Sequence, residues 1–198
     1  SEDRVGFVFP IYAYVAPKVM LDFASRIVTN GAYTFAVPTF SNAVGFGLEH
    51  FSQNACHLDA GYSILMPDNM PVFDKVVETR ESAIKKLRLA IPRFESIYEK
   101  VRDKICEFDI HYGPTPEKVT YEIGVKFLEK TRFTTTAYHV KNELCIGCGL
   151  CSGKCPAKVI KMVDNRPVWT KETCYVCMAC LNHCPTQALQ YGQFSEGK

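Results

Sequence analysis

A cysteine motif occurs twice in the last third of the sequence, and few folds can accommodate it. Residues 145–160 read CIGCGLCSGKCPAKVI, residues 174–189 read CYVCMACLNHCPTQAL, and each follows the pattern C-x2-C-x2-C-x3-C-P. Eight of the ten cysteines in this chain of 198 residues therefore lie between Cys145 and Cys184. Secreted disulfide scaffolds spread their cysteines across the core, so this clustering indicates a metal-binding domain joined to an ordinary one.

The spacing within each motif is typical of iron–sulfur ligation. Cysteines at every third position let a tightly coiled loop present three thiolates to one [4Fe-4S] cube. The fourth cysteine, turned away by the proline that follows it, reaches the cube held by the other repeat. We therefore predict two [4Fe-4S] clusters with crossed ligand sets. The first set is Cys145, Cys148, Cys151 and Cys184, and the second is Cys155, Cys174, Cys177 and Cys180.

Two other uses of these cysteines are disfavoured. Structural zinc takes two separated C-x2-4-C pairs and has no use for a third cysteine three residues further on. Disulfides at these spacings would be strained, and the cytosol would reduce them. Between the repeats, residues 159–162 and 167–169 flank the turn pair Asp164-Asn165, which predicts a small β-hairpin.

Charge and hydropathy exclude some classes of partner. The chain has 23 Lys and Arg against 21 Asp and Glu, a formal charge of +2, and its basic residues form no cluster that would indicate nucleic-acid binding. No apolar stretch approaches the roughly 18–20 residues of a membrane span. No signal peptide precedes Val5, so we expect a cytoplasmic protein.

Upstream of the cysteines, apolar runs alternate with helical patterns. Strands are predicted at 5–9, 34–37 and 62–66, with helices at 17–29 and 46–58 between them. Short connections in this order predict a parallel sheet. Since Val5–Phe9 has no polar face, we expect that strand to be buried on both sides.

The middle of the sequence is helical and charged. Residues 72–106 are expected to form two helices, because Pro92 removes a helix hydrogen bond and should break or kink the pattern. A further helix is predicted over 116–130, with its apolar residues facing inward: Val119, Ile123, Phe127 and Leu128. The isolated Cys56 and Cys106 are expected to be buried thiols on helices.

These patterns predict an α/β domain followed by an α+β domain. We place the first domain at 1–108, a linker and connecting helix at 109–137, and the metal domain at 138–198. The five histidines are scattered and form no acid–base constellation, so no catalytic residue is predicted.

Residues 138–191 resemble a bacterial two-[4Fe-4S] ferredoxin, with both motifs complete. The resemblance implies single-electron transfer at low potential and redox partner proteins. Upstream, Phe9–Tyr12 followed by Pro17 resembles the loop after the third strand of a flavodoxin-like domain. Residues 38–47 resemble the loop after its fourth strand, so the whole chain is similar to the flavodoxin–ferredoxin fusion proteins of anaerobic bacteria and archaea.

That resemblance implies flavin mononucleotide (FMN) at the carboxyl ends of the parallel strands. One wall of the ring site would be Tyr12, Ala13 and Tyr14, and the other would be Thr39, Phe40, Ser41, Gly45 and Gly47. The sequence departs from the pattern in one respect, because it has no Thr/Ser-Gly-Asn loop for the flavin phosphate.

The first two strands of a flavodoxin-like sheet have no counterpart in the sequence either, so the predicted sheet is partial. Val5–Phe9 would then be a bare apolar edge, which proteins generally avoid. We expect a preceding segment or another chain to cover it.

The predicted function is electron transfer through the two clusters, exchanging electrons with FMN in the first domain. One alternative is an FMN-dependent reductase that uses the clusters as an internal wire. Another is a flavin-free docking domain with an active ferredoxin inside a larger redox complex.

Overall fold

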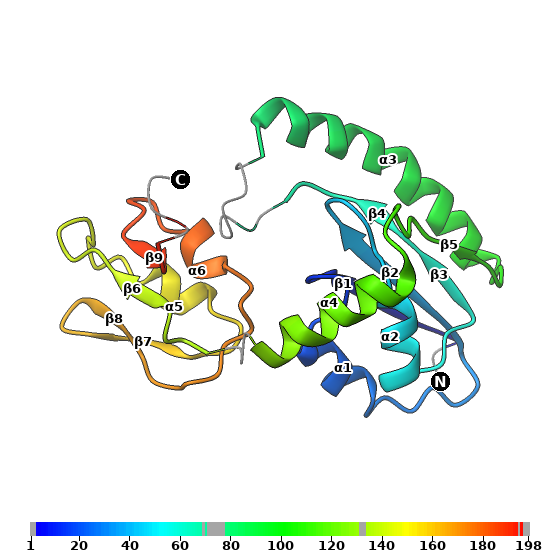
Figure 1. The fold of residues 1–198 in the computed structure, drawn as a ribbon, viewed down its shortest axis with the longest axis horizontal. Helices are drawn as coiled ribbons and strands as arrows, with labels where there is room; N and C mark the ends of the chain where they lie inside the picture. The colour runs from blue at the N-terminus through cyan, green and yellow to red at the C-terminus, as the bar shows by residue number, and fades with distance from the viewer. Residues whose placement is uncertain (1–2, 69, 71–77, 131–133, 194, 196–198) are drawn as a thin grey trace. The chain divides into compact units, whose positions relative to one another are not determined.

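The computed structural model of the chain describes residues 3–68, 70, 78–130, 134–193 and 195. It divides into two compact units (Figure 1). The first unit comprises residues 1–68 and 79–130, and the second comprises residues 69–78 and 131–198. No helix among the described residues is long and apolar enough to cross a membrane.

The first unit is built on a parallel sheet, as the sequence predicts. Its strands are β1 (Arg4–Pro10), β2 (Tyr33–Phe40), β3 (Ala60–Tyr62), β4 (Ile64–Leu65) and β5 (Phe108–Asp109). They follow the order β1-β2-β3-β5, with β4 also paired to β2, and every pairing is parallel. The helices are α1 (Lys18–Ala24), α2 (Gly47–Asn54), α3 (Arg80–Arg102) and α4 (Glu117–Lys130).

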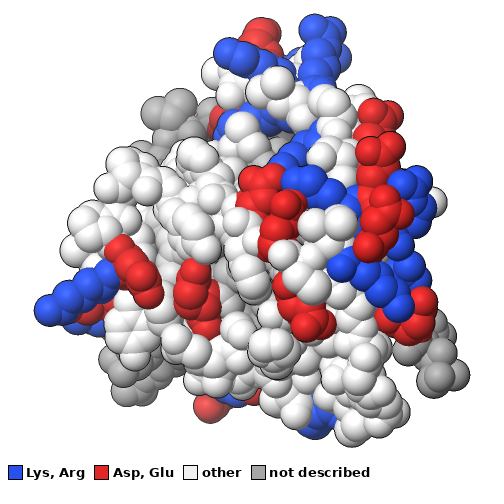
Figure 2. Space-filling view, turned by 90° about the vertical axis from the view of Figure 1, so that its right-hand side faces the viewer, with Lys and Arg blue, Asp and Glu red and all other residues white. Residues whose placement is uncertain are grey.

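Helices cover both faces of this sheet, with α3 on one side and α1 and α2 on the other (Figure 1). Alternate residues of β2 point to opposite faces, as the pleat of a strand requires. Tyr33 and Val37 belong to the core under α3, whereas Ala36 and Phe40 belong to the core under α1 and α2. Figure 2 shows acidic and basic side chains intermingled on one face of the molecule rather than gathered in separate patches.

Strand β1 forms where predicted, but it is not buried on both sides. Phe7 and Phe9 are buried, whereas Val8 is 62% exposed. The prediction failed because α3 packs over β4, further along the sheet, and leaves Val8 open to solvent. Within the described residues β1 is a terminal strand of the sheet.

Two predictions about the helices are wrong. Helix α3 runs without a break through Pro92, whose side of the helix is exposed. In α4, Val119 and Ile123 point outward, 44% and 43% exposed, and Thr120 and Gly124 are buried in their place. Gly124 allows a close approach, since a Cβ there would lie 2.5 Å from the Val15 side chain. The side chains of Phe127 and Leu128 lie outside the described residues.

Residues 109–130, which we expected to form a linker and connecting helix, lie in the first unit. The backbone N–H groups of Val44 and Gly45 donate to the carbonyls of His111 and Tyr112, at 3.0 and 3.2 Å. This segment is therefore hydrogen-bonded to the loop that follows β2.

The second unit contains two short antiparallel strand pairs and two short helices. Its elements are β6 (Tyr138–Val140), α5 (Leu150–Lys154), β7 (Ile160–Val163), β8 (Arg166–Trp169), α6 (Ala179–Asn182) and β9 (Leu189–Tyr191). Strand β6 pairs with β9, and β7 pairs with β8. The β7–β8 hairpin is the predicted one, and its turn residues Asp164 and Asn165 have φ of 46° and 58°, as a type I′ turn requires.

Candidate metal centre

The eight clustered cysteines line two small cavities in the second unit. The first cysteine cavity, about 20 Å³, is lined by Cys145, Cys148, Cys151 and Cys184. The second cysteine cavity, about 10 Å³, is lined by Cys155, Cys174, Cys177 and Cys180. Each cavity therefore takes three cysteines from one repeat and the fourth from the other. These are the two predicted ligand sets, and their role as ligands stays a prediction.

The two cysteine loops share an unusual backbone conformation. Residues with φ in the left-handed region recur at the same repeat positions, as the pairs Gly147 (70°) and Val176 (53°), Gly149 (74°) and Met178 (55°), and Lys158 (52°) and Gln187 (53°). A β-branched residue such as Val176 rarely adopts this conformation. The cysteine spacing therefore fixes the path of both loops, whatever residues occupy the positions between the cysteines.

Backbone N–H groups point at sulfur atoms in both cavities. The N–H of Val176 donates to Cys174 Sγ at 3.3 Å, and the N–H of Ala188 donates to Cys184 Sγ at 3.2 Å. Hydrogen bonds of this kind stabilise a ligating thiolate and tune an iron–sulfur centre. This donor set fits a [4Fe-4S] group, because cysteine sulfur is a soft ligand that selects iron–sulfur clusters, zinc or copper(I).

Burial controls the acidity of these thiols. It raises the pKa of Cys180 to about 12 and also raises the pKa values of Cys151 and Cys174. At Cys184, burial likewise favours the neutral thiol, but hydrogen bonds from neighbouring backbone N–H groups and the Thr186 hydroxyl outweigh it and lower the pKa. Positive metal ions are needed to hold the more buried sulfurs as thiolates. No three His, Cys, Asp or Glu side chains in the described part of the chain converge as ligands of a single metal ion.

An aromatic cluster encloses the second cysteine cavity. Tyr138, only 6% exposed, stacks on Trp169 with ring centroids 5.8 Å apart and meets the edge of Tyr191 at 4.8 Å. Its hydroxyl donates to Met178 Sδ at 3.6 Å and accepts from the Cys174 thiol at 3.8 Å. Burial raises the pKa of Tyr138, so this hydroxyl stays protonated.

Comparison with known families agrees with this geometry. A family model described as a 4Fe-4S dicluster domain matches residues 144–189, which span both cysteine motifs. No curated protein matches the chain. The match supports a ferredoxin-like domain, 4Fe-4S clusters and iron–sulfur electron transfer. The matched residues all lie in the second unit, so the match includes no residue of the first unit.

The residues predicted to form the flavin walls lie at the carboxyl ends of β1 and β2. Tyr12, Ala13 and Tyr14 follow β1, and Gly45 and Gly47 lie in and just after the β2–α2 loop. The two walls touch each other directly. A Cβ at Gly45 would lie 2.6 Å from the Tyr14 ring, and one at Gly47 would lie 3.3 Å from the Tyr14 carbonyl oxygen. A flavin ring does not fit between these residues as they are packed here.

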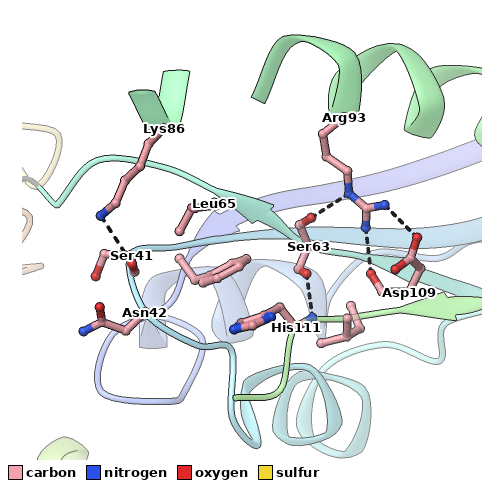
Figure 3. Close-up of a pocket in the computed structure, with 10 residues that line it drawn as sticks. Ser41, Asn42, Ser63, Leu65, Lys86, Arg93, Asp109 and His111 are labelled. Carbon is pink, nitrogen blue, oxygen red and sulfur yellow. Dashed lines mark hydrogen bonds and ion pairs between the residues drawn. The ribbon is translucent and has the colours of Figure 1, made fainter. Parts of the chain in front are cut away.

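The other three predicted residues lie at the end of β2. Thr39 lies within the strand, and its carbonyl accepts from the Ile11 N–H at 2.8 Å. Phe40 and Ser41 line a cavity of about 570 Å³ at the carboxyl ends of the strands (Figure 3). Phe40 stacks on His111, with ring centroids 5.2 Å apart. The cavity therefore has an aromatic floor and a polar rim.

Two cations on α3 also line this cavity, and neither is among the site residues predicted from the sequence. Lys86 donates to the Ser41 carbonyl at 3.4 Å, and Arg93 donates to the Ser63 carbonyl and the Asp109 carboxylate at 3.0 and 2.6 Å (Figure 3). Lys86 and Arg93 are seven residues apart, so they share one face of the helix. That spacing is the signal that could have identified them.

The isolated cysteines differ from the prediction. Cys106 is exposed and Cys56 is half-buried. Both lie beyond the ends of helices, since α2 ends at Asn54 and α3 ends at Arg102. They are therefore accessible thiols outside the metal domain rather than buried core residues.

Proposed function

We propose that this protein transfers single electrons at low potential through two [4Fe-4S] clusters held by the two crossed cysteine sets. The observation that carries the proposal is the pair of cavities, each lined by three cysteines of one repeat and the fourth of the other. A cluster, when bound, supplies the one-electron chemistry. The protein's contribution is to hold the sulfurs, direct N–H groups at them and exclude water.

Metal analysis and spectroscopy of anaerobically purified protein test this proposal. We expect about eight irons per chain, the sum of two four-iron clusters, with broad absorption near 400 nm that a strong reductant bleaches. The Cys148→Ser variant should lose about four irons, because it removes one ligand of the first set. Cys106→Ser is the matched control and should keep all of them, because Cys106 lies outside both cavities. A preparation that contains zinc and no iron would contradict the proposal.

We further propose that the first unit exchanges electrons with the clusters through FMN. Support comes from the parallel sheet and from the cavity at its carboxyl ends, where open α/β sheets bind ligands. Lys86, Arg93 and Asp109 line that cavity, and since Asp109 pairs with Arg93, these three side chains leave one net positive charge for a flavin phosphate. The packing of Tyr14 against Gly45 argues against a ring between the two predicted walls. We therefore assign FMN to the cavity and not to the space between the walls.

Titration of the protein with FMN tests this second part. Binding should quench flavin fluorescence, and Lys86→Ala should weaken it, whereas Lys126→Ala on the exposed side of α4 should not. Turnover of a small acceptor by the flavin-loaded protein would favour a reductase. A protein with full iron and no affinity for FMN would favour a docking role for the first unit.

The β1 edge supports a further proposed contact. Val8 is 62% exposed there, and within the described residues β1 pairs with β2 alone. We propose that another segment or a partner chain covers this edge, because bare apolar strand edges invite association. Amide hydrogen exchange tests it. The N–H groups of Gly6 and Val8 point away from β2, so they should exchange fast in this chain alone and be protected in the covered form.

A further inference from the structure

In each cysteine cavity a hydroxyl group lies within reach of a ligand sulfur. In the second cavity the Tyr138 hydroxyl lies 3.8 Å from Cys174 Sγ. In the first cavity the Thr186 hydroxyl lies 3.8 Å from Cys184 Sγ, and either atom can be the donor. These contacts add to the backbone N–H groups that both loops present.

The two hydroxyls do not come from equivalent positions of the repeat. The motifs are offset by 29 residues, since Cys145 corresponds to Cys174. By that offset, Pro167 takes the place of Tyr138 in the first cavity, and Ala157 takes the place of Thr186 in the second. Neither residue can donate a hydrogen bond from its side chain. The backbone is thus nearly symmetric, whereas the side-chain donors are not.

The two hydroxyls also differ in how firmly they are held. Tyr138 is 6% exposed and its ring is fixed between Trp169 and Tyr191. Thr186 is only half-buried, so water can compete for its hydroxyl. A buried donor in a low-dielectric site acts more strongly on a nearby charge than one that is partly solvated.

We propose that Tyr138 is a positioning residue that sets the potential of the second cluster apart from that of the first. This inference rests on the proposed function. When Cys174 ligates iron, its proton leaves to solvent, and the Tyr138 hydroxyl then donates to the thiolate in place of Met178. Reduction by one electron increases the negative charge on the sulfurs. The donated hydrogen bond therefore stabilises the reduced form more than the oxidised form and raises the potential.

The Tyr138→Phe variant of the full chain tests the proposal, because phenylalanine keeps the ring packing and removes only the hydroxyl. We expect a titration followed by electron paramagnetic resonance to show one of the two couples moving to lower potential. The expected change is about tenfold in the reduction equilibrium, or about 59 mV for a one-electron couple. The other couple should stay in place.

Two matched variants locate the effect. Thr186→Val should lower the potential of the couple that Tyr138→Phe leaves unchanged. The change should be smaller than that of Tyr138→Phe, because the Thr186 hydroxyl is partly solvated. Tyr191→Phe removes a hydroxyl from the same aromatic cluster and should move neither couple. Within the described residues the Tyr191 side chain makes ring contacts but has no hydrogen bond to a sulfur.

The outcomes separate this inference from the proposed function. If iron analysis finds no iron in the wild-type protein, the proposed function itself is contradicted. A Tyr138→Phe variant with about eight irons and two unchanged potentials would overturn only the role of Tyr138. If that variant loses iron, a difluorotyrosine placed at position 138 keeps the shape and strengthens the donor. This substitution should raise the potential of one couple. Two unchanged potentials in this variant would also overturn the inference.

Discussion

The two units of this molecule are stabilised in different ways. The first unit buries large side chains, among them Phe9, Phe51 and Tyr62, between a sheet and helices on both faces. The second unit has strands of three or four residues and helices of four or five. Its buried core includes three of the cysteines, Cys151, Cys155 and Cys180. An ordinary apolar core therefore lies beside one that is partly built from metal ligands.

This difference indicates where the folding free energy of each unit comes from. A unit below about 70–80 residues seldom buries enough apolar surface to fold without a metal or disulfides. Since ligands of a bound metal must be brought together, the free energy of metal binding becomes free energy of folding. We infer that the second unit depends on its clusters, whereas the first does not.

Removal of iron should produce the largest difference between the units. Chelation of the oxidised protein should unfold the second unit and leave the first folded. Trp169 is the single tryptophan of the chain and lies in the second unit, so its fluorescence reports that unit alone. We expect its emission to shift to the red while most of the helical circular dichroism, which comes from α3 and α4, persists.

A Cys106→Ser protein treated in the same way controls for loss of thiols outside the metal domain. Native Trp169 emission in protein shown to be free of iron would mean that the second unit folds on its own core. That result would contradict the inference that the second unit, unlike the first, depends on its clusters for its folding free energy.

The reverse experiment removes part of the apolar core. Phe51 is fully buried and stacks on Phe9 with ring centroids 4.8 Å apart. Phe51→Ala should destabilise the first unit by about 3–5 kcal/mol, the usual loss for a large buried aromatic residue. Urea unfolding followed by circular dichroism measures this change. The absorption of the clusters should be unaffected, and its loss would show that the units do not fold independently.

A smaller effect distinguishes the two cysteine loops. A side chain at Gly147 would need φ of 70° and would bring a Cβ to 2.9 Å from the Asn165 carbonyl oxygen. Gly147→Ala should therefore destabilise the second unit by about 1–3 kcal/mol.

Val176 holds the equivalent position of the second loop and is buried. Val176→Gly should relieve backbone strain but lose apolar burial, so its net cost should be about 1 kcal/mol. Unfolding followed by Trp169 fluorescence compares the two variants. Equal losses of unfolding free energy in the two variants would mean that both loops tolerate a side chain at this position equally well.

Sequence reasoning succeeded where covalent spacing fixes the geometry. The C-x2-C-x2-C-x3-C-P pattern was enough to group the eight cysteines into the two sets that line the cavities. The Asp164-Asn165 pair was likewise enough to place the hairpin, because few residues adopt the required turn.

It failed where tertiary contacts decide between local alternatives. Apolar spacing pointed Val119 inward, but α4 packs through Gly124 because a small residue allows close approach to the backbone near Val15. Pro92 lies on an exposed side of α3, where packing elsewhere along the helix outweighs one missing hydrogen bond. The contacts of the Tyr138 and Thr186 hydroxyls with the cysteine sulfurs depend on tertiary packing that no spacing reveals.

The smallest expected effect is a pH dependence confined to the first unit. Hydrogen bonding to the Arg93 guanidinium, with a further contribution from Lys100, holds the pKa of Asp109 below its usual value. The unfolded chain therefore takes up this proton at a higher pH than the folded one. The stabilisation is complete above the usual pKa near 4 and is lost as the pH falls through the folded value.

Thermal unfolding of the first unit, followed by circular dichroism between pH 7 and pH 3, measures this contribution. Asp109→Asn keeps the shape of the side chain and removes the charge. The variant should be slightly less stable than wild type at pH 7, and the difference should shrink as the pH falls toward 3, because the unfolded chain takes up the Asp109 proton before the folded one does. Because the carboxylate is nearly half exposed, solvent screens the ion pair and keeps the effect small. A difference that stays constant across this range would mean that the Asn side chain disturbs packing and that the ion pair contributes nothing.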